Sequence, residues 1–248
     1  SDPANGTVTL SGAGAGSGSA GFAATVDQQI GSAGLEDIES DLVLWLDATN
    51  IDGNYNNNEV YSSNTAISTW KDLSGKGNHV TQSSSSRSPL YKTAIINEKP
   101  VMDFDGSNDY MWTETNHNLN TATMILVTKL GAIDFTGNSS GGGAVTIQQK
   151  SSGNFDSIVY HEGSDADRKF MNGSSGYART PKLISNTAVT TTGPMIVIDQ
   201  IKDQDFKLFM NGNQVASHGY ESTSKTNTRF IIGNRHFDGS GTVAAGNG

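Results

Sequence analysis

The stretch from Leu42 to Tyr110 decides the fold, and it consists of four short segments in a fixed order. It opens with Leu-Val-Leu-Trp-Leu-Asp-Ala at 42–48, and Asp-Gly-Asn-Tyr-Asn-Asn-Asn-Glu follows at 52–59. Trp-Lys-Asp-Leu-Ser-Gly-Lys-Gly-Asn-His occupies 70–79, and Met-Asp-Phe-Asp-Gly-Ser-Asn-Asp-Tyr closes the stretch at 102–110. Short apolar runs bounded by Gly, Asn and Asp are typical of β-strands joined by tight turns.

The rest of the chain keeps the same pattern, which predicts an all-β protein with very little helix. Asn211-Gly212 lies between alternating apolar residues, and this pair favours a two-residue hairpin because both positions tolerate positive φ. The predicted strands are 42–47, 67–71, 100–104, 110–113, 124–130, 144–149, 157–161, 194–201, 206–210, 214–217 and 229–233.

Residues 1–40 differ from the remainder because Gly, Ala and Ser dominate them. Such a tract is typical of a flexible linker. The alternative is an extended arm that packs closely on another backbone, with Phe22–Val26 anchored on a hydrophobic surface. A single helical turn is expected over 34–39. We therefore expect an N-terminal arm or linker at 1–40 and one domain at 41–248.

Composition excludes several classes of function. The net charge is −9 and the pI is about 4.9, and no basic cluster is present, so nucleic-acid binding is not expected. The chain has no cysteine, which excludes disulfides, thiolate zinc sites and cysteine nucleophiles. No apolar run is long enough for a membrane-spanning helix, so membrane insertion is not expected either.

Three motifs resemble a known family. Leu-x-Leu-Trp-Leu-Asp-Ala at 42–48, Trp-x-Asp-x-Ser-Gly-x-Gly-Asn at 70–78 and Phe-Asp-Gly-x-Asn-Asp-Tyr at 104–110 resemble the laminin-G-like, concanavalin-A-like lectin and glucanase superfamily, in the form found on bacterial and phage surfaces. The resemblance covers roughly residues 41 to 237. It implies an antiparallel two-sheet jelly-roll sandwich outside the cell, on a cell or virion surface. Related domains usually add a strand near 248, so the arm, a neighbouring molecule or a longer chain would have to complete the sheet.

The acidic loop after the first predicted strand suggests a calcium site. Asp52, Asn54 and Asn56 have the alternate spacing that opens many calcium loops, and Asp47 and Glu59 flank them with further carboxylates. The alternative is a solvated loop whose side chains cap their own backbone. Asn at positions where related domains carry Asp lowers the charge available to the ion.

Polar residues at two other turns are predicted to be structural. Asp105 and Asp109 bracket the turn at Gly106, and Asx side chains satisfy free N–H groups in such turns. A second group, at Asp72, Ser74 and Asn78, is expected to hold the irregular Gly-rich loop between 72 and 79.

Aromatic residues are the candidate ligand contacts. Trp45 and Trp70 lie in apolar strand patterns and are expected in the core, whereas Trp112 and Tyr110 precede a polar stretch. Exposed aromatic faces bind the C–H faces of sugars and also serve protein interfaces.

These observations favour a non-catalytic binding or adhesion module for a glycan or another surface ligand, with Ca²⁺ as the candidate cofactor. The alternative is a structural subunit of an extracellular filament or virion surface that self-assembles through its N-terminal arm by strand exchange. Enzymatic activity is not expected, because no strand carries the paired Glu pattern that glucan hydrolysis needs.

Overall fold

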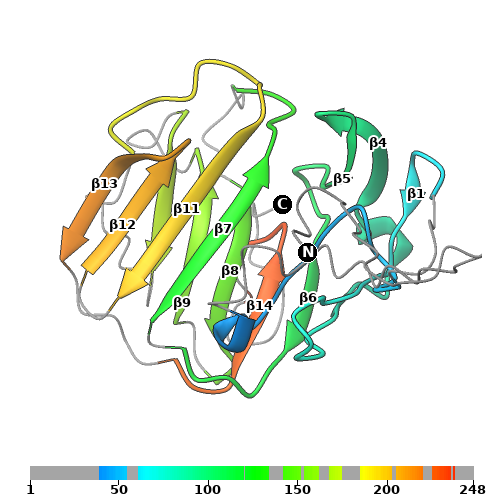
Figure 1. The fold of residues 1–248 in the computed structure, drawn as a ribbon, viewed down its shortest axis with the longest axis horizontal. Helices are drawn as coiled ribbons and strands as arrows, with labels where there is room; N and C mark the ends of the chain where they lie inside the picture. The colour runs from blue at the N-terminus through cyan, green and yellow to red at the C-terminus, as the bar shows by residue number, and fades with distance from the viewer. Residues whose placement is uncertain are drawn as a thin grey trace, which may run out of the picture.

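The computed structural model describes residues 39–54, 61–119, 121–133, 142–151, 154–161, 168–174, 185–202, 205–219, 225–235 and 237. Within these ranges the chain is all-β, with two single-turn 3₁₀ helices, η1 (Glu39–Asp41) and η2 (Ser85–Arg87) (Figure 1). No helix in the described part is long and apolar enough to cross a membrane. Most of the arm at 1–40, including Phe22–Val26, lies outside the described residues.

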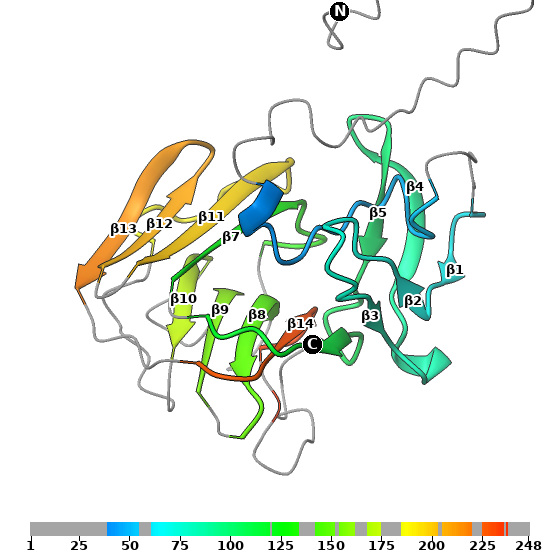
Figure 2. The ribbon, with the colours of Figure 1, turned by 60° about the horizontal axis from the view of Figure 1, so that its bottom comes forward.

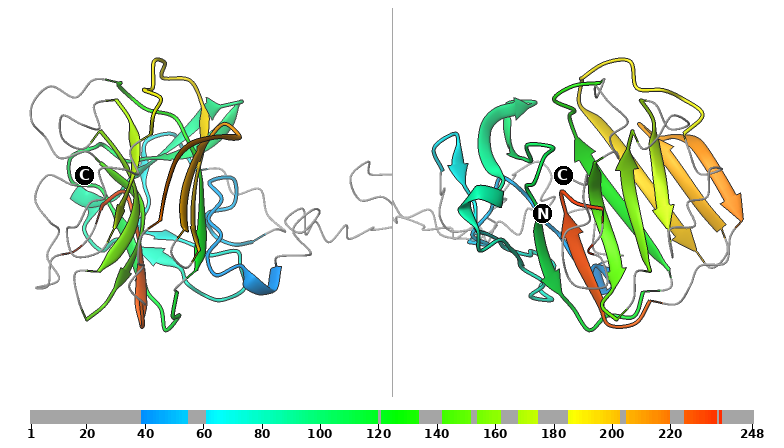
Figure 3. Two further views of the ribbon diagram at one scale, coloured as in Figure 1. Left: turned by 90° about the vertical axis from the view of Figure 1, so that its left-hand side faces the viewer. Right: turned by 180° about the vertical axis from the view of Figure 1, so that it is seen from behind.

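Across the described ranges, fourteen strands form three antiparallel sheets, and two of these sheets stand face to face as a sandwich (Figure 3, left). The strands are β1 (Thr65–Ala66), β2 (Thr69–Trp70), β3 (Val80–Thr81), β4 (Leu90–Ile96), β5 (Lys99–Asp103), β6 (Met111–Glu114), β7 (Ala122–Thr128), β8 (Gly143–Gln149), β9 (Phe155–Tyr160), β10 (Phe170–Ser174), β11 (Met195–Lys202), β12 (Asp205–Met210), β13 (Asn213–Gly219) and β14 (Thr228–Ile232).

The seven-stranded sheet has the order β10-β9-β8-β14-β6-β3-β2, and the four-stranded sheet has the order β13-β12-β11-β7. The three-stranded sheet β1-β4-β5 lies beside the sandwich, next to β2 and β3 (Figure 2). The chain is therefore an antiparallel jelly-roll β-sandwich, as the sequence predicts.

The main core lies between the two large sheets. Alternate residues of each strand point into it, as the pleat requires. Ile147, Ile158 and Phe230 contribute from the seven-stranded sheet, and Val197 and Leu208 from the four-stranded sheet. A second core cluster lies around Trp70, Val80, Tyr91 and Met111. Trp70 is buried, as predicted, whereas Trp45 is only partly buried.

The hairpin prediction is confirmed. Asn211 and Gly212 both have positive φ, 48° and 82°, and they join β12 to β13. The predicted strands at 100–104, 110–113, 124–130, 144–149, 157–161, 194–201 and 229–233 correspond to β5, β6, β7, β8, β9, β11 and β14, with ends shifted by one or two residues.

The strand predicted at 42–47 is wrong, although the segment is held in place. Its backbone is hydrogen-bonded to side chains and to the irregular loop at 72–79 instead of to a neighbouring strand. The N–H of Trp45 donates to Asp72 Oδ1 (2.9 Å), and the Trp45 carbonyl accepts from the N–H of Leu73 (2.8 Å). The side chain of Asn78 donates to the Val43 carbonyl (2.7 Å).

Two longer strands are missing from the sequence prediction. β10 contains Asn172 and Gly173, residue types that are depleted in strands. β4 carries a positive φ at Ala94 and an irregular register against β5, so its alternation is broken.

Candidate functional site

The outer face of the seven-stranded sheet is the face that points away from the core. The strand registers place two rows of side chains on it. One row runs Thr81, Trp112, Ile231, Thr146, Ser157 across β3, β6, β14, β8 and β9. The other row runs Glu114, Arg229, Gln148, Phe155. Both rows alternate with the core residues, as the pleat requires.

A C-terminal segment crosses this outer face; its described residues are Asn234, Arg235 and Phe237. Thr146 donates its hydroxyl to the Asn234 carbonyl (3.0 Å). The segment lies so close to β8 that a Cβ on Gly143 would be 2.2 Å from the Arg235 nitrogen. Glycine is therefore required at 143 for this approach.

Phe237 completes an aromatic cluster with two predicted ligand residues. Its ring lies edge-on to Tyr110 at 5.5 Å and to Trp112 at 5.6 Å between ring centroids. Phe237 is buried, whereas Tyr110 and Trp112 are partly exposed. Edge-to-face pairs of this kind stabilise a fixed ring orientation. Trp112 thus lies at the surface within a built cluster rather than as an isolated exposed ring.

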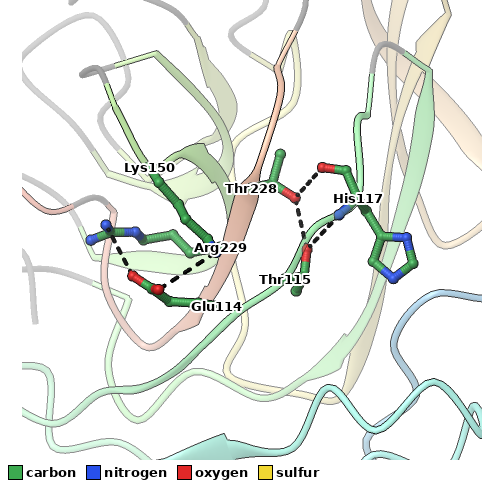
Figure 4. Close-up of polar contacts among 6 residues, drawn as sticks. All are labelled: Glu114, Thr115, His117, Lys150, Thr228 and Arg229. Atoms are coloured by element: carbon green, nitrogen blue, oxygen red, sulfur yellow. Dashed lines mark hydrogen bonds and ion pairs between the residues drawn. The ribbon is translucent and has the colours of Figure 1, made fainter.

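Arg229 joins the aromatic cluster to two charged side chains. Its guanidinium carbon lies 5.7 Å from the Trp112 ring and 5.3 Å from the Phe237 ring. Its Nη2 is 3.5 Å from Glu114, and Glu114 is also 3.5 Å from Lys150 Nζ (Figure 4). Burial lowers the pKa of Arg229, and the carboxylate of Glu114 partly offsets this. The guanidinium stays charged because its ordinary pKa is so high.

A buried threonine pair fixes the end of β6 against the start of β14. The hydroxyls of Thr115 and Thr228 are 3.1 Å apart, and Thr228 also donates to the His117 carbonyl (Figure 4). The His117 N–H donates to the Thr115 hydroxyl at 3.2 Å. Since Glu114 and Arg229 each adjoin one of these threonines in sequence, the pair sets the register in which the two charged groups meet.

This cluster combines the features that recognise hydroxyl-rich ligands. Partly exposed rings offer apolar surface for C–H groups. Beside them, a carboxylate with half of its side chain exposed and two cations supply acceptors and donors for hydroxyls. We refer to Tyr110, Trp112, Glu114, Lys150 and Arg229 as the outer-face cluster.

The structure brings Asp72, Ser74 and Asn78 together in the Gly-rich loop. Asp72 is buried, and its carboxylate accepts from the N–H groups of Trp45, Ser74 and Asn78 and from the Ser74 hydroxyl. Gly75 and Gly77 take positive φ of 78° and 74° in the same loop. Asp72 therefore connects this loop to the segment at 42–47.

The turn at Gly106 is built around Asp105. Its Oδ1 accepts from the N–H groups of Ser107, Asn108 and Asp109. Burial acts to raise the pKa of Asp105, but these three bonds outweigh it and the pKa lies below its usual value. Asp109 accepts from the Asp105 N–H, and burial raises the pKa of Asp109.

The predicted calcium ligands are only partly described. Asp47 Oδ1 accepts from the N–H and the hydroxyl of Thr49, and Asp52 Oδ1 accepts from the Asn54 N–H. Asn56 and Glu59 lie outside the described residues. In the part of the chain that the structure covers, no three His, Asp or Glu side chains converge as metal ligands do.

Sequence reasoning missed Glu114, Lys150, Arg229, Gln148 and Phe237. They are far apart in the sequence and meet only through the pairing of β14 between β6 and β8. Residues alternate between the two faces of the sheet in Trp112-Thr113-Glu114 and in Arg229-Phe230-Ile231. This alternation indicated that Glu114 and Arg229 lie on the outer face, but it did not specify which strands are neighbours.

No protein-family model matches the chain, and no curated protein matches it. Among solved structures, a GH54 α-L-arabinofuranosidase soaked with 4-nitrophenyl α-L-arabinofuranoside superposes with a TM-score of 0.50 at 11% identity, over 72% of this chain and 45% of that one. Domain 4 of AbnA, a GH43 extracellular arabinanase from Geobacillus stearothermophilus, reaches 0.49 at 14% identity, over 71% and 87%. At 11% identity, the likeness to the arabinofuranosidase shows a shared β-sandwich fold.

Proposed function

We propose that this protein is a non-catalytic, extracellular module that binds glycans through the outer-face cluster. The observation that carries the proposal is the arrangement of Trp112, Arg229 and Glu114: a partly exposed ring, a cation packed on it and a carboxylate paired with that cation. Sugar recognition in proteins uses such rings for C–H faces and charged planar groups for hydroxyls. The shared fold with an enzyme soaked with an arabinofuranoside supports carbohydrate as the ligand class.

Binding rather than hydrolysis is proposed because of how the carboxylates are placed. Glu114 is paired with two cations, and a carboxylate in such pairs suits the role of a hydrogen-bond acceptor for hydroxyls. Retaining or inverting hydrolysis needs two carboxyl groups across one bond. Among the described residues, Glu114 is the carboxylate that belongs to the outer-face cluster.

A glycan array with the full chain tests this proposal. We expect binding to one or a few glycans by the unmodified protein and a loss of roughly fivefold to thirtyfold in affinity for Trp112→Ala, since a stacked ring contributes on the order of 1–2 kcal/mol. Ile125→Ser, on the opposite face of the molecule, is the matched control and should bind normally. An array without signal, or equal loss in both variants, would refute the proposal.

A second function, assembly through the N-terminal arm, is favoured by the outer surface of the four-stranded sheet. Ile125 and Val127 of β7 are 63% and 61% exposed there, and Ile196 of β11 lies opposite Val127. β7 ends this sheet, and no strand in the described ranges pairs with its free edge. We propose the arm of a neighbouring copy, through Phe22–Val26, as the occupant.

Analytical ultracentrifugation separates the two functions. If the arm assembles the protein, deletion of 1–26 and the double change Ile125→Ser with Val127→Ser should each give monomers and leave glycan binding intact. Assembly that survives both changes would exclude this second function. Trp112→Ala should leave the oligomeric state as it is.

A further inference from the structure

Four polar side chains lie buried inside the main core, among the apolar residues that fill the sandwich. Lys225 lies just before β14, Asp156 on β9, Asn172 on β10 and Asp199 on β11. The side chain of Lys225 is 0% exposed and that of Asp156 is 4% exposed. Asn172 and Asp199 are fully buried as well. The group therefore links both large sheets at a place that water does not reach.

Two close contacts organise this group. Lys225 Nζ forms an ion pair with Asp156 Oδ2, and Asn172 Nδ2 donates to Asp199 Oδ2 across the gap between the sheets. On the neighbouring strands, Asp199 is flanked by the apolar core residues Met124 and Leu208. In the described part of the chain, Asp156 Oδ1 and Asp199 Oδ1 accept no hydrogen bond.

The two carboxyl groups of this cluster have raised pKa values. Burial raises the pKa of Asp156, although Lys225 acts in the opposite direction. Burial also raises the pKa of Asp199 to well above its usual value, and the nearby charge of Asp156 raises it further. A dry ion pair is costly because desolvation offsets much of its attraction. A proton transfer from Lys225 to Asp156 would remove both charges and would leave an amine against a carboxylic acid.

We propose that Lys225 and Asp156 join in an intramolecular amide bond inside the sandwich core, with Asp199 as the group that carries the proton. In this step the Lys225 amine attacks Cγ of Asp156 and a new N–C bond forms. Asp199 accepts a proton from the attacking nitrogen and delivers one to the departing oxygen. The C–O bond of Asp156 breaks and one water molecule leaves. The atoms and the net charge of the ion pair equal those of the amide plus one water molecule. The reaction therefore needs no oxidant, reductant or cofactor.

The surroundings favour this condensation over the ion pair. An amide carries no net charge, so it ends the desolvation cost of two buried ions. Release of water from an apolar core opposes the reverse hydrolysis. The bond would tie β9 to the segment that leads into β14, and it would close a long loop covalently in a chain that has no cysteine for a disulfide.

The intact mass of the purified full chain, measured after denaturation, tests the proposal. We expect a mass lower than that of the sequence by one water molecule. Trypsin should then release a branched species that joins residues 151–168 to residues 208–229, because an acylated Lys225 is not cleaved. The branched peptide is required, since a succinimide at Asp105-Gly106 would remove the same mass without a cross-link.

Variants separate the cross-link from a structural ion pair. Lys225→Arg retains the cation but cannot form the amide, so it should show the full sequence mass and a midpoint of thermal unfolding lower by roughly 10 °C. Asp199→Asn should leave most molecules without the cross-link. Loss of ammonia in place of water would assign the bond to Asn172 and overturn the pairing with Asp156. Unmodified protein with the full sequence mass and separate tryptic peptides would overturn the proposal.

Discussion

Gln148 binds the backbone of Phe237 at both ends of its amide group. Its Nε2 donates to the Phe237 carbonyl at 2.7 Å, and its Oε1 accepts from the Phe237 N–H at 2.9 Å. Both residues are buried. The side chain of Gln148 thus takes the place of a neighbouring strand for Phe237, and it fixes the ring that packs against Tyr110 and Trp112.

Replacing Gln148 by Leu should destabilise the protein and weaken the outer-face cluster together. The change removes both bonds and leaves the buried N–H and carbonyl of Phe237 without these partners, which costs about 2–4 kcal/mol in the free energy of unfolding. Urea denaturation followed by tryptophan fluorescence measures it. Glycan affinity should fall as well, because Phe237 no longer holds Trp112. A variant as stable as the unmodified protein would contradict this account.

The close approach at Gly143 gives a second prediction. In Gly143→Ala the new Cβ would lie 2.2 Å from the Arg235 nitrogen, so the C-terminal segment must shift away from β8. We expect loss of glycan affinity and a stability cost of about 1–3 kcal/mol from this overpacking. Gly131→Ala is the matched control, because a Cβ added there would have no atom within 4 Å. Similar behaviour of the two variants would show that the segment tolerates displacement.

The ion pair between Glu114 and Arg229 should contribute more to binding than to stability. Half of the Glu114 side chain is exposed, so Glu114→Gln should change the free energy of unfolding by less than about 1 kcal/mol, and by less still at high salt. Glycan affinity should fall by roughly tenfold, because a charged acceptor is replaced by a neutral one. Calorimetric titration at two salt concentrations measures both effects. A large loss of stability with unchanged glycan affinity would show that this ion pair contributes to stability and not to binding.

The calcium hypothesis for the loop from Asp47 to Glu59 is open to a direct test. A weak extracellular site has a dissociation constant of about 0.1–1 mM, so several millimolar Ca²⁺ should raise the unfolding midpoint by a few degrees. Asp52→Ala should remove this shift, whereas Mg²⁺ should not reproduce it. Asp105→Ala is the control, since its carboxylate serves a different turn. Equal midpoints with Ca²⁺ and with chelator would exclude the site.

The fold could be predicted from the sequence where the pattern is local. Asn211-Gly212 needs positive φ at two adjacent positions, and β11 is an apolar run bounded by turns. The segment at 42–47 shows the limit, because its apolar pattern specifies burial but not whether its backbone partner is a strand or the Asp72 carboxylate. The outer-face cluster and the buried group around Lys225 depend on which strands are neighbours, and a single sequence does not contain that information.

The buried carboxyl of Asp199 should make stability depend on pH in one direction. Its pKa in the folded protein lies well above the usual value because of burial first, then the charge of Asp156, while Asn172 and Lys225 act to lower it. The folded state therefore keeps a proton that the unfolded state releases above its ordinary pKa near 3.8. Stability must fall as the pH rises from that value toward the folded pKa, by up to about 1.4 kcal/mol per pH unit.

Asp199→Asn made in a Lys225→Arg background isolates this dependence, because neither protein then forms the amide, and Asn keeps the shape and an acceptor for Asn172 but does not titrate. Urea denaturation between pH 4 and pH 7 should show Lys225→Arg losing stability relative to the double variant as the pH rises. Asp156 has a raised pKa as well, and its own contribution remains in both proteins because it stays a free carboxyl group in each. If the two stability curves run parallel over this range, Asp199 is ionised in the folded protein. Its carboxylate would then have to be stabilised by a cation or a donor inside the core.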